Sequence, residues 1–323
     1  HNVYIAGPNG PALEWVKREN INFIESPLDD WEKQIESLQD ILMAIDKYRI
    51  DIVHAHPFNS QIVGALAAYI RKKPCITTIH GEYVSPALEA FLRPLFAKYI
   101  CVGKNLKELY MEHGIDDEDI EVIKNGVPIK KRPDRTSFFR NGLINLCYIS
   151  RLDDDKIKAL EFLLDCIPQL VKEFPLRLII VGDGSNFNRV REICKSINEE
   201  LHEEIIQLVG GSTDVFRYIE KSDMVVGIGR VLLEAVSMGK FSLCIGDSYY
   251  TGFVGADDFI KFSDYNFTGR NMKREQKLQN LMDDIREIYF DIDNKFKDLV
   301  GIWNILKDSF SLEISAKKHI DCY

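Results

Sequence analysis

The sequence lacks several patterns that would define its class at once. Its apolar runs stay short of the ~18 residues needed to span a bilayer, and its first residues show no signal-peptide pattern. It has no Walker A motif and no Gly-x-Ser-x-Gly elbow. The seven cysteines include no Cys-x-x-Cys pair, and the cysteines and histidines lack zinc-site spacing. We therefore expect a soluble or peripheral cytoplasmic protein with reduced cysteines and no bound metal.

An excess of positive charge is also lacking. The chain has 41 lysines and arginines against 50 aspartates and glutamates, a formal net charge of −9. Nucleic-acid binding depends on cations that neutralise phosphates, so this balance argues against a nucleic-acid partner. A length of 323 residues with 46% hydrophobic residues suits two ordinary globular domains.

In the first part of the chain, short apolar runs alternate with longer amphipathic stretches, which is typical of a parallel sheet covered by helices. The first run starts the sequence without a Met, so we expect the true start of the fold to be missing. The predicted strands are Asn2–Ala6, Ile21–Ile24, Asp51–Ala55, Cys75–Ile79, Tyr99–Val102 and Ile120–Ile123. The predicted helices include Trp31–Tyr48, Asn59–Arg71 and Lys104–His113.

The alternation restarts after a polar, proline-bearing break at residues 130–135. The sequence therefore predicts an α/β protein with two Rossmann-like domains facing across a cleft. In such sheets, ligands bind outside the carboxyl ends of the strands. The second set of predicted strands is Leu146–Ser150, Leu176–Val181, Ile205–Val209, Met224–Val226 and Ser242–Ile245.

A candidate anion site follows the first strand of this second set. Arg151 stands at the end of that strand and Lys156 at the start of the next helix, so two cations can converge on one diphosphate. The alternative is a surface ion-pair loop in which Asp153–Asp155 cap the helix.

Glycine turns follow three other strands, and a turn of this kind serves either ligand approach or close packing. Gly229 precedes a helix whose first N–H groups could face phosphate, and Glu234 lies one turn further on, where it could bind a ribose diol. Gly182, in a Gly-Asp-Gly turn, and Val209 with Gly210 are candidates for the base side of the site.

Histidines end two strands of the first domain. His80 follows the strand Cys75–Ile79 and could bind a sugar hydroxyl or help position the reacting centre. His54 and His56 flank the end of the preceding strand. The alternative for each is a structural histidine with satisfied hydrogen bonds.

In their order along the chain, these stretches resemble the retaining glycosyltransferases of family four, which have the GT-B fold. The resemblance spans residues 1–245. It is carried by residues 51–56 (DIVHAH), 77–81 (TTIHG), 122–127 (VIKNGV), 150–156 (SRLDDDK), 181–184 (VGDG) and 229–240 (GRVLLEAVSMGK).

The resemblance implies a role for each candidate. Arg151 and Lys156 would hold the donor diphosphate, Glu234 would bind the ribose, and His80 would lie near the transferred sugar. The family transfers sugar with retention, by front-face attack with the leaving phosphate as base, and without a bound metal cofactor. Backbone N–H groups facing the phosphates are expected at Gly229, Arg230, Val231 and Leu232.

The same resemblance sets the expected domains: an acceptor-side domain at 1–135, a nucleotide-sugar domain at 136–307, and a helix at 308–323 returning to the first domain. Three departures stand out. Val226 occupies the position of a second family glutamate, which contacts the donor sugar. The family's first strand and its glycine-rich loop are missing. Phe241 replaces a common proline.

We therefore expect a glycosyltransferase that moves a sugar from a nucleotide donor, UDP-sugar by default, to a glycan or lipid-linked acceptor. Peripheral contact with the inner membrane face could come from Arg71–Lys73 and Lys130–Arg132. Two alternatives are a non-catalytic nucleotide-sugar-binding or scaffolding member of the fold, suggested by Val226, and a sugar-nucleotide epimerase.

Overall fold

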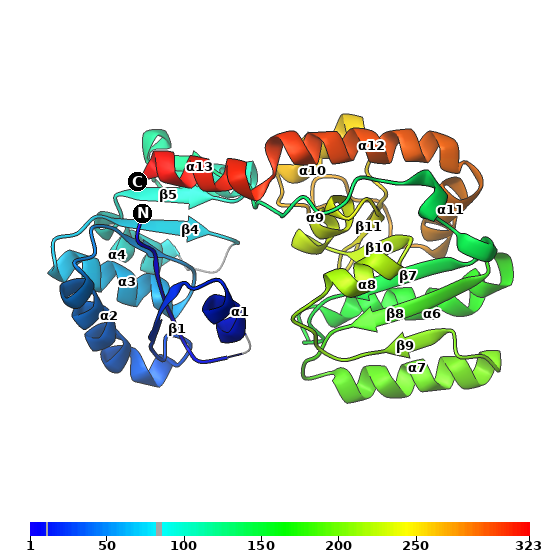
Figure 1. The fold of residues 1–323 in the computed structure, drawn as a ribbon, viewed down its shortest axis with the longest axis horizontal. Helices are drawn as coiled ribbons and strands as arrows, with labels where there is room; N and C mark the ends of the chain where they lie inside the picture. Colours follow the sequence, from blue (N-terminus) through cyan, green and yellow to red (C-terminus); the bar gives the residue numbers. More distant parts are fainter. Residues whose placement is uncertain (11, 82–85) are drawn as a thin grey trace. The chain divides into compact units, whose positions relative to one another are not determined.

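The computed structural model describes residues 1–10, 12–81 and 86–323, and it divides the chain into two compact units (Figure 1). Unit 1 contains His1–Lys124 and Lys317–Tyr323, and unit 2 contains Asn125–Ala316. The division precedes the polar break at residues 130–135. That break packs within unit 2, where the N–H groups of Lys130 and Lys131 donate to the carbonyl of Ser237.

Unit 1 contains two parallel sheets. In the smaller, β1 (Tyr4–Gly7) pairs with β2 (Asn22–Glu25). The larger has the order β3-β4-β5-β6. Its strands are β3 (Val53–Ala55), β4 (Cys75–Ile79), β5 (Lys98–Cys101) and β6 (Ile120–Val122). The helices are α1 (Ala12–Arg18), α2 (Gln34–Tyr48), α3 (Asn59–Ile70), α4 (Pro86–Leu92) and α5 (Lys104–Glu112).

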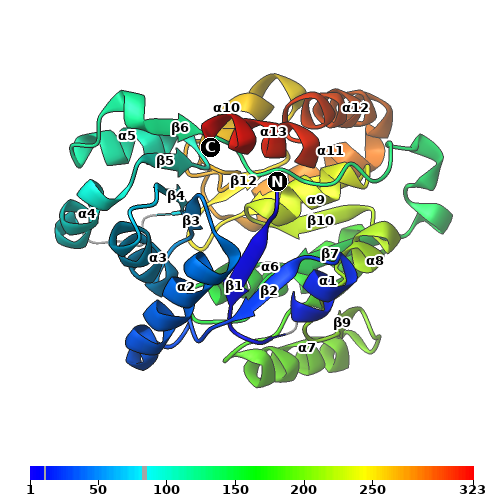
Figure 2. The same cartoon turned by 60° about the vertical axis from the view of Figure 1, so that its left-hand side comes forward.

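Small residues bring α3 onto the larger sheet. A Cβ on Gly64 would lie 3.1 Å from the Cβ of Ala55, so the helix and β3 approach closely. Ala65, Ala67 and Ala68 are fully buried on the same helix, and α2 packs against α3 (Figure 2). All five residues of β4 are buried, as expected for a central strand covered on both faces.

Unit 2 is built on one six-stranded sheet with the order β12-β11-β10-β7-β8-β9. All pairings are parallel except that of β12 with β11, so the carboxyl ends of five strands meet at one edge. The strands are β7 (Ile144–Ile149), β8 (Leu176–Val181), β9 (Ile206–Leu208), β10 (Met224–Gly227), β11 (Phe241–Ile245) and β12 (Tyr250–Gly252).

Helices cover both faces of this sheet, and neighbouring strand residues enter different cores: Val225 packs in one apolar cluster and Val226 in the other. The helices are α6 (Ile157–Glu173), α7 (Phe187–Leu201), α8 (Phe216–Lys221), α9 (Arg230–Ser237), α10 (Phe259–Ser263), α11 (Leu278–Phe290) and α12 (Ile292–Ser309). None of the helices in the described ranges combines the length and apolar composition that a membrane span requires.

The final helix, α13 (Leu312–Cys322), starts in unit 2 and ends in unit 1. Near its start, the N–H of Val127 donates to the carbonyl of Phe310 (2.9 Å), and the N–H of Leu312 donates to that of Val127 (3.2 Å). The segment that enters unit 2 is therefore tied to the segment that leaves it. At the other end of the helix, Cys322 packs against a core cluster of unit 1.

The predicted fold class is confirmed: the protein is α/β, with two Rossmann-like units built on parallel sheets. Cys75–Ile79 and Leu176–Val181 have the predicted bounds, and most other predicted strands differ by one or two residues. The short antiparallel strand β12 was not predicted.

Candidate functional site

The loop from β7 to α6 presents two cations at the carboxyl edge of the sheet in unit 2. The guanidinium of Arg151 donates to Asp153 (2.8 Å) and to Asp155 (3.4 Å). The ammonium of Lys156 lies 3.0 Å from the same oxygen of Asp155. The structure thus brings Arg151 and Lys156 together, as the sequence predicted, and places a carboxylate between them.

The three aspartates of this loop do not cap α6, so the capping part of the alternative is wrong, whereas its exposed ion pairs are present. Lys156 occupies the N-cap position, without a capping hydrogen bond from its side chain. Asp153 instead accepts from the backbone N–H of Ser185 (3.1 Å), and Asp154 accepts from the side-chain amide of Asn186 (2.8 Å). Both bonds fasten the loop to the start of α7, because the carboxylates point toward the neighbouring turn rather than along their own helix.

The turns after β8 and β9 meet at the same edge. The N–H of Gly182 donates to the carbonyl of Gly210 (2.9 Å), and the N–H of Val209 donates to that of Ile180 (2.9 Å). A Cβ on Gly182 would overlap the carbonyl oxygen of Ser150, so close packing already requires glycine there. The three base-side candidates, Gly182, Val209 and Gly210, therefore lie together, and their role in binding a base stays a prediction.

The turn before α9 leaves fewer backbone N–H groups without a partner than predicted. The N–H of Gly229 donates to the carbonyl of Phe267 (2.9 Å), and the N–H of Leu232 donates to that of Gly229 (3.1 Å). Both groups are engaged within the protein, so neither is available as predicted. Arg230 and Val231 retain the first-turn N–H groups that an α-helix leaves without an intrahelical partner. Gly229 has a φ of +72°, a conformation that favours glycine.

Glu234 lies one turn into α9 and is largely enclosed, with 13% of its side chain exposed. The Nε of Arg230 donates to its carboxylate at 2.9 Å. The carboxylate is thus oriented by an arginine that is itself 56% exposed. A diol that approaches Glu234 would meet an acceptor already held in one position.

Val226, at the position of the second family glutamate, is fully buried in β10 and pairs with Leu243 and Tyr148 on the neighbouring strands. Val226 belongs to the apolar core, so a buried valine side chain stands where the family has a carboxylate. Phe241 is also fully buried, with its ring 5.0 Å from that of Phe138.

In unit 1, four histidines form a cluster at the ends of β3 and β4. The Nδ1 of His56 lies 3.1 Å from the Nε2 of His80, and their rings stack. The ring of His54 also stacks with that of His56, and its centroid lies 5.9 Å from that of His319 on α13. The Nδ1 of His54 lies 2.6 Å from the hydroxyl of Tyr323, and its Nε2 lies 2.7 Å from that of Thr78.

The cluster favours neutral imidazoles. Burial, followed by the neighbouring histidines, lowers the pKa of His54 to about 3 and that of His80 to about 4. Burial and His319 also lower the pKa of His56. At neutral pH the rings of His54, His56 and His80 therefore each carry one donor and one acceptor, which suits hydrogen bonds to uncharged hydroxyl groups. His54 already uses both nitrogens, for Tyr323 and Thr78.

His319 and Tyr323 were missed by the sequence analysis. They join His54 across more than 260 positions of sequence, and no local pattern signals such a contact. The one available signal was the expectation that the last segment returns to the first domain, which named no residue.

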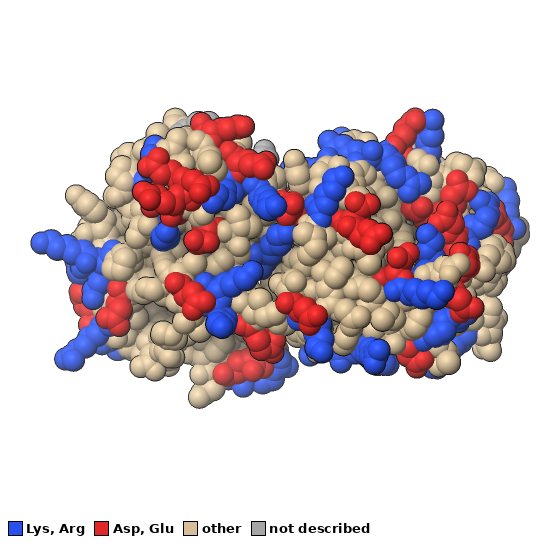
Figure 3. All heavy atoms as spheres, turned by 90° about the horizontal axis from the view of Figure 1, so that it is seen from above, with Lys and Arg blue, Asp and Glu red and all other residues tan. Residues whose placement is uncertain are grey.

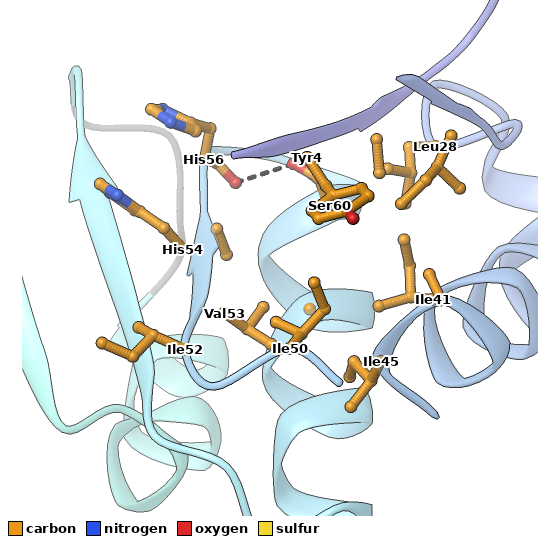
Figure 4. Close-up of a pocket in the computed structure, with 15 residues that line it drawn as sticks. Tyr4, Leu28, Ile41, Ile45, Ile50, Ile52, Val53, His54, His56 and Ser60 are labelled. Atoms are coloured by element: carbon orange, nitrogen blue, oxygen red, sulfur yellow. Dashed lines mark hydrogen bonds between the residues drawn. The ribbon is translucent and has the colours of Figure 1, made fainter. Parts of the chain in front are cut away.

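An apolar pocket of about 200 Å³ lies beside His54 and His56 of this cluster, with walls from both sheets of unit 1 (Figure 4). Tyr4, His54, His56 and Ser60 provide its polar groups, and the hydroxyl of Ser60 donates to the carbonyl of His56 (2.9 Å). Its apolar walls include Leu28, Ile41, Ile45, Ile50 and Val53.

The basic clusters are partly neutralised. Arg71 makes a two-pronged contact with Asp46 (2.7 and 2.8 Å), and Lys131 lies 3.6 Å from Glu220. On the face drawn in Figure 3, lysines and arginines lie among aspartates and glutamates. No group of three or more histidines, cysteines or carboxylates suited to a metal ion occurs among residues 1–10, 12–81 and 86–323.

These features define a two-unit α/β protein of the Rossmann-like class, with cations and glycine turns at the carboxyl edge of one sheet. A model of Glycosyltransferase Family 4 matches residues 1–131, and a model of Glycosyl transferases group 1 matches residues 144–246. Together the two models match most of the chain, so it belongs to the glycosyltransferases that they describe, as its motifs predicted.

The chain is 26% identical to the UDP-Gal:alpha-D-GlcNAc-diphosphoundecaprenol alpha-1,3-galactosyltransferase of Escherichia coli, over 64% of this chain and 60% of that enzyme. It therefore spans less than two thirds of that relative. It is also 26% identical to phosphatidyl-myo-inositol mannosyltransferase of Mycobacterium tuberculosis, over 42% of this chain and 37% of that enzyme.

Solved structures share the fold. HepE of Anabaena in complex with UDP-glucose has a TM-score of 0.75 at 17% identity, covering 99% of this chain and 90% of that one. A glycosyltransferase from Rickettsia africae has a TM-score of 0.72 at 20% identity, covering 100% of this chain and 89% of that one.

Proposed function

We propose that this protein is a retaining glycosyltransferase that transfers a sugar from UDP-sugar to a glycan or lipid-linked acceptor. The observation that carries the proposal is the set of groups at the carboxyl edge of unit 2. Two cations, Arg151 and Lys156, the start of α9 and the oriented carboxylate of Glu234 all lie at the ends of parallel strands.

Each group has a task in this reaction. Arg151 and Lys156 bind the diphosphate and stabilise the charge that develops on it as the sugar leaves. The N–H groups of Arg230 and Val231 contribute donors to the same oxygens. Glu234 accepts hydrogen bonds from the ribose, and Gly182, Val209 and Gly210 line the base. No metal is needed in this scheme because the protein's own cations neutralise the diphosphate.

In unit 1, His80 is the proposed catalytic residue that binds the transferred sugar. Its neighbour His56 fixes one ring nitrogen, so the other is directed to a sugar hydroxyl. The apolar pocket beside His54 and His56 supports an acceptor with an apolar portion. The two relatives from Escherichia coli and Mycobacterium tuberculosis carry names of lipid-linked acceptors, which supports peripheral work at the cytoplasmic membrane face.

The test is calorimetric titration of UDP, GDP and ADP, without added metal, into wild type, Glu234→Ala and Glu199→Ala. The control residue, Glu199, is an exposed glutamate of α7. UDP should bind the wild type and the control equally, and Glu234→Ala should weaken binding roughly tenfold, as expected for a charge-assisted hydrogen bond. If none of the three nucleotides binds the wild type, the proposed donor site is wrong.

A second candidate is a non-catalytic member that binds the nucleotide sugar without transferring it. The burial of Val226, where the family pattern has a carboxylate, favours this alternative. It predicts UDP binding with neither sugar transfer nor donor hydrolysis. Incubation of the protein with radiolabelled UDP-sugars and a diphosphopolyprenol-linked acceptor separates the two, because only the enzyme yields labelled lipid.

A further inference from the structure

Asp155 holds a position that distinguishes it from its two acidic neighbours. Asp153 and Asp154 are anchored to the start of α7 through Ser185 and Asn186. One carboxylate oxygen of Asp155 lies 3.4 Å from Arg151 and 3.0 Å from Lys156. Asp155 therefore bridges the two cations that the proposed function assigns to the donor diphosphate.

This carboxylate is ionised at neutral pH and open to solvent. The hydrogen bond from Lys156 lowers the pKa of Asp155, with a further contribution from Arg151. More than half of its side chain is exposed. A carboxylate and a phosphate accept from the same guanidinium and ammonium donors, so both cannot fully occupy them at once.

We propose that Asp155 is an internal competitor of the donor diphosphate. Its carboxylate pairs with Arg151 and Lys156 when no ligand is bound. These ion pairs break when a diphosphate binds and form again when the diphosphate product leaves. The proposal rests on the proposed function and names a residue that sets the affinity of that site.

The opposite role, in which Asp155 holds the cations ready for the ligand, is better filled by Asp153. Asp153 binds Arg151 at 2.8 Å while its other oxygen accepts from the backbone of Ser185. It therefore keeps the guanidinium oriented after Asp155 has moved away. Removing Asp155 should free the cations without releasing Arg151 from the loop.

The test compares wild type, Asp155→Asn and Asp154→Asn by calorimetric titration of UDP and, separately, of inorganic pyrophosphate. Both variants lose one negative charge in the same loop, but Asp154 binds the amide of Asn186 rather than a cation. Asp155→Asn should bind both probes roughly three- to tenfold more tightly, because the ligand no longer has to replace two exposed ion pairs. Asp154→Asn should change by less than about twofold, because solvent and salt screen its charge.

Weaker or unchanged binding in Asp155→Asn, or equal tightening in the two variants, overturns the proposal. Pyrophosphate separates this result from failure of the donor site. UDP could fail to bind both the wild type and Asp155→Asn while pyrophosphate binds Asp155→Asn more tightly than the wild type. In that case the proposed donor is wrong, but Asp155 still competes with phosphate for the two cations. If neither probe binds the wild type or Asp155→Asn, both proposals fall.

Discussion

Arg151 is a single side chain with two carboxylate partners and 66% of its surface exposed. Replacing it with alanine removes a phosphate-binding fork, but the wild-type arginine must first give up part of its contact with Asp153 and Asp155. We therefore expect Arg151→Ala to weaken UDP binding by about 1.5 kcal/mol, the lower end of the range for hydrogen bonds to charged groups. Calorimetric titration measures this loss.

The matched control is Arg191→Ala. Arg191 is a similarly exposed arginine on α7 that lies 3.8 Å from the carboxylate of the adjacent Glu192. Its removal lowers the positive charge of unit 2 by the same amount and should leave UDP affinity unchanged. An equal loss in both variants would mean that net charge, rather than the position of Arg151, attracts the nucleotide.

The sequence predicted which residues lie at the ends of strands, but not all of the contacts that these residues make. Arg151 and Lys156 were found because a strand, a turn and a helix follow each other in a recognisable pattern. The ion pairs of this loop belonged to the stated alternative, but the bonds that Asp153 and Asp154 make to Ser185 and Asn186 were not predicted, because the loop backbone decides between capping and such contacts. The engaged N–H of Gly229 was missed because its partner, Phe267, is remote in sequence.

Among the elements, the turn between β8 and α7 tolerates little change. A Cβ on Gly182 would overlap the carbonyl oxygen of Ser150 and lie 3.3 Å from Leu152. We expect Gly182→Ala to destabilise unit 2 by about 1–3 kcal/mol, as overpacking does, and to weaken UDP binding by shifting the neighbouring loop. Denaturant unfolding and titration measure the two effects.

Gly255→Ala is the control for this element. Its nearest neighbour, Asp298, would lie 3.7 Å from the added Cβ, an ordinary contact distance, and its φ is −69°. The free energy of unfolding should change by less than about 0.5 kcal/mol. Equal destabilisation by both substitutions would contradict the packing argument.

Strands with turn residues at both ends were the most predictable. β4 and β8 were predicted with the observed bounds because a proline directly precedes each strand and a glycine turn follows it. The three-residue β12 was missed because its pairing with β11 depends on a register shift and on a contact with Arg274. Such short strands are stabilised by their neighbours rather than by their own composition.

On the scale of the whole molecule, the histidine cluster links stability to pH. A histidine in the unfolded chain takes up a proton near pH 6.5, whereas folded His54 and His80 stay neutral down to about pH 3 and 4. Between these values the unfolded state binds more protons, so stability falls as the pH falls from 6.5 toward 4, by up to ~1.4 kcal/mol per pH unit for each histidine. Thermal unfolding between pH 7.5 and 5 should show a decreasing Tm.

His54→Gln should make that decrease less steep, because glutamine can donate and accept but does not titrate in this range. His202→Gln, at the C-terminal end of α7 and outside the cluster, is the control and should keep the wild-type slope. Parallel pH profiles in all three proteins would show that the cluster does not govern acid stability.

Unit 1 is assembled from both ends of the chain, since Lys317–Tyr323 complete what His1–Lys124 begin. During translation, the residues that separate these segments take on the order of ten seconds or more to synthesise. During that interval unit 2 is synthesised, and the hydrogen bond between His54 and Tyr323 cannot yet form. The contacts of His54 with His319 and Tyr323 can therefore form only after all of unit 2 has been synthesised, and a chain that stops before Lys317 lacks them.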